Sequence, residues 1–198
     1  MDELDLLDWK RHVFELYAAV RRQPKPMEAW ALWRREREGL FREHPESPIA
    51  VDERPSYTGP HVFDYDPAWR LLAVVEPADE QSFELPSSNG ETMSFRRFGV
   101  ARAEGVELEL YWLESYGGGM FIPFADATSG NETYGAGRYI LDTVKGADLG
   151  VIDGRLVLDF NFAYQPSCSY DVRWTCPLAP PANRLQLPVR AGERLRPS

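Results

Sequence analysis

The chain has 198 residues, of which 43% are hydrophobic and 13% aromatic, and this composition excludes an intrinsically disordered protein. Its formal net charge of −9 would repel a nucleic-acid backbone. The acidic N-terminus does not resemble a signal peptide, and no apolar run approaches the roughly 18 residues of a membrane span. The sequence therefore predicts a cytoplasmic protein, folded as a single domain over residues 1–198, with neither nucleic acid nor a membrane as a partner.

Two amphipathic helices are predicted in an N-terminal segment, residues 1–50. Over residues 3–22, apolar side chains recur at spacings of three and four, which is typical of one face of a helix. Pro24 and Pro26 end this helix, and Pro26 also suits the first position of a second one. The sequence HPESP, which starts at residue 44, ends the second helix. We expect this helical segment to pack on the rest of the chain.

From residue 55 onward, short apolar alternations separated by turn residues predict antiparallel β structure. In the sequence VELELYWL, Leu108, Leu110 and Trp112 share one face of a strand, and Glu107 and Glu109 share the other. No predicted strand is followed by a helical pattern, which disfavours parallel βαβ units. The predicted strands cover residues 69–76, 92–99, 106–114, 120–124, 137–144 and 155–164.

These elements together predict an α+β fold that is mainly β. We expect an antiparallel β-sandwich or a partly closed β-barrel, preceded by the two N-terminal amphipathic helices. The β portion, residues 55–198, ends in a proline-rich sequence, CPLAPPANRLQLP, which predicts an extended C-terminal strap because proline removes backbone donors and fixes φ.

The segment FADATSGNETYGAGRY, residues 124–139, is dense in polar side chains and glycines between apolar strands. A phosphate-binding Walker A loop is excluded, because Ala136 and Gly137 stand where Lys and Ser or Thr are required, and the dinucleotide fingerprint fails as well. Loops of this kind often carry binding sites, although an elaborate hairpin would explain the same residues. The candidate site residues here are Asp126, Thr128, Tyr134 and Arg138.

A second group of polar residues lies in the predicted strand RLVLDFNFAY. Strand alternation would place Asp159 and Asn161 about 6 to 7 Å apart on one face. They could form the polar patch of a cavity, with Tyr164 in its wall. An ion pair of Asp159 with Arg138 or Arg155 is the alternative.

Three functions are compatible with these residues. The first is a pocket that binds a small polar or anionic molecule, and the second is an enzyme in which Asp126 and Asp159 act as general acid and base. In that enzyme Thr128 or Tyr134 would donate hydrogen bonds, and Arg138 would hold the substrate or merely neutralise an aspartate. The third is an interaction module that uses the amphipathic helices. A homodimer is compatible with each of them.

Cys168 and Cys176 are too few for a disulfide scaffold in a chain of this length. They are compatible with structural thiols, with a disulfide or redox pair, or with a ligand or catalytic role. The three histidines lie in the first third of the chain and lack the short spacing of a zinc site. The sequence therefore predicts no metal site, and it predicts no cofactor.

Five long sequence blocks stand out along the chain: WRREREGLFREHPESPI (33–49), YDPAWR (65–70), FIPFADATSGNETYGAGRY (121–139), LDFNFAYQPSCSY (158–170) and CPLAPPANRLQLPVRAGE (176–193). Together they resemble the domain-of-unknown-function family 1684 of bacteria and archaea. In the middle block the matching residues are Pro123, Phe124, Asp126, Thr128, Gly130, Tyr134, Gly137, Arg138 and Tyr139. The resemblance spans nearly the whole chain and implies that the blocks belong to one module, but it implies no reaction.

Overall fold

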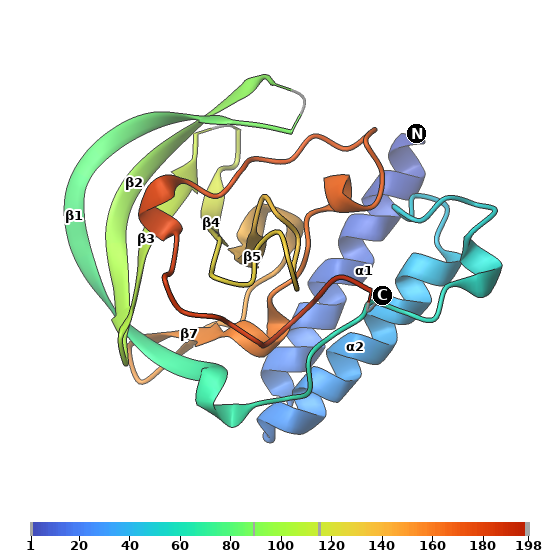
Figure 1. Cartoon of the computed structure of the whole chain (residues 1–198), viewed down its shortest axis with the longest axis horizontal. Helices are drawn as coiled ribbons and strands as arrows, with labels where there is room; N and C mark the ends of the chain where they lie inside the picture. The colour runs from blue at the N-terminus through green and yellow to red at the C-terminus, as the bar shows by residue number, and fades with distance from the viewer. Residues whose placement is uncertain (1, 89, 115, 197–198) are drawn as a thin grey trace.

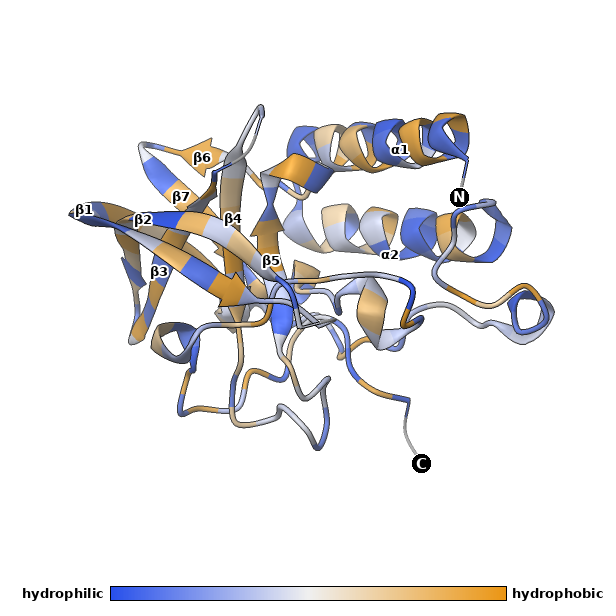
Figure 2. Ribbon diagram, turned by 90° about the horizontal axis from the view of Figure 1, so that it is seen from above, coloured by the Kyte–Doolittle hydropathy of each residue, from blue (hydrophilic) through white to orange (hydrophobic). Residues whose placement is uncertain are grey.

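The structure is a computed structural model that describes residues 2–88, 90–114 and 116–196. Within these residues, the chain begins with the two predicted helices, α1 (Glu3–Arg22) and α2 (Pro26–Glu43). The side chain of Asp2 accepts hydrogen bonds from the first turn of α1, which accounts for its starting point. The two helices run side by side (Figure 2). Neither they nor any other described helix has the length and apolar character needed to cross a membrane.

Seven strands of the described residues form one antiparallel sheet in the order β5-β4-β3-β2-β1-β7-β6. The sheet curls into a half-barrel, and both helices lie beyond its β5 end (Figure 1). The predicted α+β fold is therefore confirmed, as a partly closed single sheet. The strands are β1 (Arg70–Pro86), β2 (Thr92–Ala103), β3 (Val106–Leu113), β4 (Gly119–Phe124), β5 (Arg138–Asp142), β6 (Val151–Ile152) and β7 (Arg155–Asp159).

Two strands differ most in extent from the prediction. The strand expected over residues 69–76 continues to Pro86, because pairing with β2 resumes at Gln81 after a register shift that begins at Pro77. The strand expected over residues 155–164 ends early, because the carboxylate of Asp159 accepts the backbone N–H of Asn161 and starts a 3-10 turn. The strand alternation predicted for Asp159 and Asn161 is therefore wrong.

The apolar core follows the alternation of β3 only in part. Leu108 and Leu110 are completely buried, as predicted, whereas Trp112 is 38% exposed. The neighbouring strand β2 has a bulge between Arg97 and Gly99, which pair with Tyr111 and Leu110 of β3, directly before Trp112. A bulge increases the local twist, and the predicted alternation of buried and exposed side chains in β3 fails next to it. One cluster of buried residues fills the curl of the sheet, and a second cluster, which includes Trp33 of α2, joins the sheet to the helices.

The predicted C-terminal strap is extended and crosses the open side of the half-barrel (Figure 1). It continues beyond the proline-rich sequence, and we use the name strap for residues 176–196. Asn183 fastens its first part, because its side-chain amide donates to the carbonyls of Glu109 and Pro123 and accepts the N–H of Glu109. Leu185 N donates to Ala125 O at 2.8 Å, beside the end of β4. The strap thereby closes over the interior in which the polar segment 124–139 lies.

Candidate functional site

Asp126 and Arg138, two of the predicted site residues, meet as an ion pair in the interior. Arg138 Nη2 lies 3.3 Å from Asp126 Oδ1, and both side chains are completely buried. The other oxygen of Asp126 accepts the backbone N–H of Val189 at 2.7 Å and the hydroxyl of Thr128 at 2.8 Å. Every carboxylate oxygen of Asp126 thus has protein donors, so this residue ties the polar segment to the strap.

The two η nitrogens of Arg138 also donate to the same strap. Its guanidinium donates to the carbonyls of Val189 at 2.8 Å, Glu193 at 3.0 Å and Ala191. Burial lowers the pKa of Arg138, and the charge of Asp126 opposes that effect. Of the two roles predicted for Arg138, neutralising an aspartate matches these contacts.

The other residues predicted for the site lie in separate places. Thr128 is buried beside Asp126 and bonds to Thr133. Tyr164 packs edge-on against Tyr139 and beneath the guanidinium of Arg37, at 5.0 Å. Burial raises the pKa of Tyr134, and the neighbouring Cys168 raises it further. Of the predicted residues, Asp159 alone lines one of the three cavities of the described residues that we compare below.

Asp159 and Asn161 form a third group, at the end of β7. The side-chain amide of Asn161 donates to Asp159 Oδ1 at 2.9 Å and to the carbonyl of Asp66 at 2.8 Å. Arg70 Nε is 3.6 Å from Asp159 Oδ2, so Arg70 is the cation beside Asp159, in place of the predicted Arg138 or Arg155. Asp159 borders a small hollow of about 240 Å³.

Burial makes Asp159 a titrating group with a predictable effect on stability. Burial raises the pKa of Asp159 to about 6, and hydrogen bonds from Asn161 and the charge of Arg70 oppose the rise. A carboxyl group whose pKa is higher in the folded than in the unfolded chain stabilises the fold fully at low pH, and this contribution is lost as the pH rises through 6.

We therefore expect Asp159→Asn to remove a pH-dependent loss of stability. Between pH 4 and pH 7, the free energy of unfolding of the wild type should fall by about 2–3 kcal/mol relative to the variant. Urea unfolding at both pH values measures the difference, and asparagine keeps the acceptor for Asn161. A difference that does not change with pH would show that Asp159 stays ionised throughout.

Asp8, His12 and His44 come together outside the predicted site, with one ligand atom of each within 4.8 Å of the others. The backbone N–H of Glu46 donates to His44 Nδ1 at 3.0 Å, so the neutral ring carries its proton on Nε2, 3.3 Å from Asp8 Oδ2. A metal on Nε2 would displace that proton while Nδ1 still accepted a bond, which neutral imidazole does not allow. These bonds favour a hydrogen-bonded chain over a metal centre.

A cavity of about 390 Å³ brings together three segments that are distant in the sequence. They are residues 57–61, which precede the first strand, residues 165–170, and residues 194–196 at the end of the strap. Backbone bonds hold the three together, from Arg194 N to His61 O at 2.8 Å and from Glu193 N to Ala163 O at 2.7 Å. We call this space the strap cavity.

Unpartnered polar atoms concentrate around the strap cavity. Among the described residues, eight buried side-chain nitrogen or oxygen atoms have no hydrogen-bond partner, and four of them belong to residues that line it. A buried polar atom without a partner costs about 1–3 kcal/mol. The four atoms are Tyr57 Oη, Gln165 Oε1, Ser169 Oγ and Arg194 Nε.

The residues that line the strap cavity carry more positive than negative charge, with Arg194 and Arg196 against Glu53. Burial lowers the pKa of His61, and the charges of Arg196, Arg194 and Arg34 lower it further. Of the described residues that line the cavity, Glu53 is the only one with a carboxylate, and it is exposed. The buried carboxylate of Glu193 nearby is already paired with Arg37 at 2.5 Å.

Two glycines allow the segments to approach one another so closely. Gly192 has φ +75°, and a Cβ there would lie 2.4 Å from the carbonyl oxygen of Ala163. Gly59 has φ +97°, and its Cβ would lie 2.9 Å from the side chain of Glu38 on α2. Glycine tolerates the positive φ at both positions, and the absence of a side chain lets the backbone pass close to these atoms at the edge of the cavity.

The sequence reasoning missed the strap cavity altogether. Its one local signal is the run of polar residues that follows the apolar β7 segment, which contains Gln165 and Ser169. Tyr57 and Arg194 line the same cavity only because two segments more than a hundred residues apart are in contact, and no local sequence pattern predicts that contact.

Comparison with known proteins identifies a family and one solved structure, both without an assigned function. A family model described as "Protein of unknown function (DUF1684)" matches residues 55–194, which include Tyr57, Gln165 and Arg194 and exclude both helices. The solution NMR structure of an uncharacterized protein from Haloarcula marismortui is 35% identical, with a TM-score of 0.56. That alignment covers 82% of this chain and 90% of the other. No curated protein matches the chain.

Proposed function

The chain belongs to the DUF1684 family, and we propose that it binds a small organic anion that carries a hydroxyl group in the strap cavity. The observation that carries this proposal is the set of four buried, unpartnered polar atoms on residues around one positively charged cavity. The volume of about 390 Å³ falls within the roughly 300–1,000 Å³ of typical ligand sites.

The chemistry of the four atoms selects the class of ligand. Arg194 Nε–H is a donor, and the hydroxyls of Tyr57 and Ser169 can donate as well, so the ligand should be rich in acceptor oxygens. Burial raises the pKa of Tyr57, which keeps its phenol protonated at neutral pH. Gln165 Oε1 is an acceptor, since its amide nitrogen already donates to Arg194 O at 3.3 Å. A phosphate or carboxylate with a neighbouring hydroxyl offers acceptors to the three donors and a donor to Gln165 Oε1.

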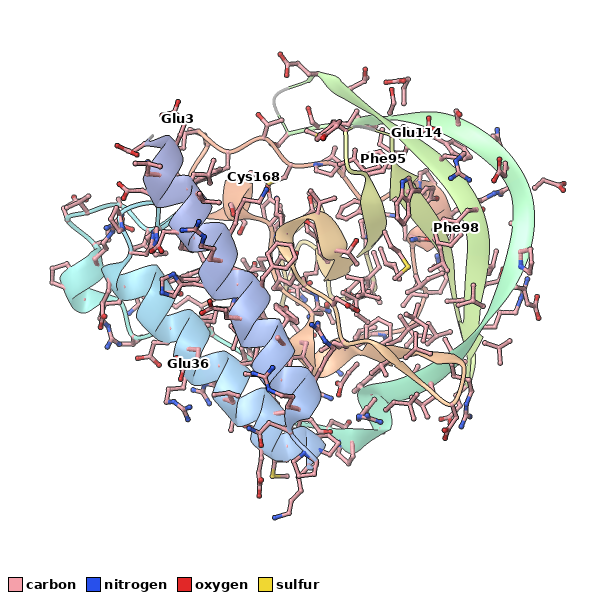
Figure 3. The ribbon with its side chains drawn as sticks, turned by 180° about the vertical axis from the view of Figure 1, so that it is seen from behind. Glu3, Glu36, Phe95, Phe98, Glu114 and Cys168 are labelled. Atoms are coloured by element: carbon pink, nitrogen blue, oxygen red, sulfur yellow. The ribbon has the colours of Figure 1, made fainter. Side chains whose placement is uncertain are left out.

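The groove between the helices is a poorer candidate for an anion, although it is larger, at about 580 Å³. Glu15, Glu36 and Glu43 line it, and Figure 3 shows Glu36 on the outer side of α2. Three carboxylates repel a negatively charged ligand. The groove also lies outside the residues that the family model matches.

The proposal concerns binding and assigns no reaction. The acid–base pair predicted from the sequence gives no support to catalysis in the strap cavity. The carboxylate of Asp126 accepts hydrogen bonds from Arg138 and Val189, and that of Asp159 accepts one from Asn161. Neither aspartate is among the residues that line the cavity.

Isothermal titration calorimetry with three probes tests the proposal. Glycerol 3-phosphate offers an anion and hydroxyls, inorganic phosphate offers the charge alone, and glycerol offers hydroxyls alone. We expect affinity to fall in that order, with no measurable heat for glycerol. Arg194→Gln should weaken the binding of glycerol 3-phosphate about 10- to 100-fold, since it removes one charge-assisted hydrogen bond.

Arg190→Gln is the matched control, because Arg190 is exposed and already paired with Glu132. Its affinity should stay within about twofold of the wild type. Arg196→Gln, at an exposed position, gives a second test should Arg194→Gln not fold. If none of the probes binds, or if both cavity variants bind as the wild type does, the strap cavity is not an anion site.

A further inference from the structure

Cys168 and Cys176 lie outside the proposed binding function, and the structure brings them into the same buried cluster. Both are free thiols, Cys176 belongs to the cluster that joins the sheet to the helices, and Cys168 packs against that cluster. Each thiol shifts the pKa of the other. Cys168 belongs to the 3-10 turn Ser167–Ser169, which Figure 3 places between the helix pair and the sheet. Cys176 begins the strap, where its backbone N–H donates to Ser88 Oγ at 3.1 Å and its carbonyl accepts the N–H of Ser88 at 2.9 Å.

The two thiols are not equivalent. Cys168 is half-buried, whereas Cys176 is only 1% exposed. The thiol of Cys176 lowers the pKa of Cys168 to about 6; burial opposes this effect, and the hydroxyls of Ser88 and Tyr134 add to it. The contact with Cys168 raises the pKa of Cys176, and burial raises it further. The contact therefore favours the thiolate on Cys168 and the thiol on Cys176.

We propose that Cys168 and Cys176 form a peroxide-reactive pair, in which Cys168 is the attacking sulfur and Cys176 the resolving one. The accessible sulfur is the one that can meet a small oxidant, and the buried sulfur lies against it, ready to close a disulfide. The pair therefore differs from two unrelated structural thiols, since Cys168 supplies the accessible sulfur and Cys176 supplies the second sulfur of the disulfide.

The reaction balances with hydrogen peroxide as the only co-reactant. The Cys168 thiolate attacks one peroxide oxygen, the O–O bond breaks, and the leaving hydroxide takes up the proton that Cys168 had released, giving water and a sulfenic acid. Cys176 sulfur then attacks Cys168 sulfur, the S–O bond breaks, and the hydroxyl leaves with the Cys176 proton as a second water. Two thiols are oxidised to one disulfide, and one peroxide is reduced to two waters.

The surrounding contacts hold the two sulfurs in place. The hydroxyl of Tyr139 donates to the carbonyl of Pro177 at 2.5 Å, directly after Cys176. On the other side, Ser169 N donates to the carbonyl of Pro166 at 2.9 Å across the turn that carries Cys168. Hydrogen bonds therefore hold the chain next to each of the two cysteines.

The test is to treat the reduced full-length chain with one equivalent of hydrogen peroxide and to count thiols with Ellman's reagent and intact mass. We expect both thiols to be lost, the monomer mass to fall by two hydrogen atoms, and dithiothreitol to reverse both changes. The reaction should be roughly tenfold faster than that of free cysteine at pH 7, because the thiolate is the reactive form.

Two variants assign the roles. In Cys176→Ser, dimedone should trap a sulfenic acid on Cys168, and in Cys168→Ser, the remaining thiol should react at least about tenfold more slowly than the wild type. Wild-type thiols that survive one equivalent of peroxide, a disulfide that joins two chains, or equal reactivity of the two single variants would each overturn the proposal. The wild-type measurement decides the matter even if a variant does not fold.

Discussion

Replacing Arg138 with methionine is expected to lower the free energy of unfolding by about 3–5 kcal/mol. The change leaves the buried carboxylate of Asp126 without its cation and removes the donors to the carbonyls of Val189 and Glu193. Methionine fills much of the same space, so the loss reflects charge and hydrogen bonding more than a cavity. Urea unfolding followed by circular dichroism measures the effect.

A double-mutant cycle shows whether the ion pair itself is responsible. Once Arg138 is methionine, the further change Asp126→Asn should have a much smaller effect than it has in the wild type, because the uncompensated charge disappears. Arg190→Met is the control, since Arg190 pairs with Glu132 at the surface and should contribute little to stability. Equal losses for Arg138→Met and Arg190→Met would contradict the structural role of Arg138.

Glu193→Gln is expected to destabilise the chain by a similar amount, about 3–5 kcal/mol. Glu193 is completely buried and receives Arg37 Nε at 2.5 Å, the N–H of Gln165 at 2.7 Å and the hydroxyl of Tyr170 at 3.2 Å. Glutamine keeps the shape but leaves the charge of Arg37 unpaired, where the guanidinium is only 12% exposed. Thermal and urea unfolding should both show the loss.

The expected loss has a structural meaning, because Arg37 belongs to α2 and Glu193 to the strap. The pair joins the N-terminal helices to the end of the chain. Glu132→Gln provides the control, since it also neutralises a glutamate paired with an arginine, but Glu132 is only half-buried and its partner Arg190 is exposed. If Glu193→Gln unfolds at the same urea concentration as Glu132→Gln, the buried pair does not hold the helices to the strap.

The fold could be predicted from local patterns where those patterns act alone. The helices follow from apolar spacing and from Pro24 and Pro26, and Leu108 and Leu110 are buried as their alternation predicts. The errors arise where a side chain or a neighbouring strand overrides the pattern. Asp159 ends its strand by capping a turn, and a bulge in β2 leaves Trp112 exposed.

The site was harder to predict than the fold. The segment 124–139 does contain an aspartate and an arginine that form an ion pair, yet Arg138 donates to a carbonyl of the strap and the pair is completely buried. The strap cavity depends on Tyr57, Gln165 and Arg194, which backbone bonds between distant segments bring together. Such contacts leave no periodicity in the sequence, so only the three-dimensional structure reveals them.

The most direct test of the anion site is an NMR titration of the ¹⁵N-labelled chain with glycerol 3-phosphate, observing the Nε–H signal of Arg194. The proposal predicts a saturable shift of that signal, together with shifts of the backbone amides of Gln165 and Ser169. The same titration should leave the amides of Glu15 and Glu36, on the helix groove, unchanged. Saturable shifts at the groove with none at Arg194 would contradict the proposal, and so would a spectrum that does not change.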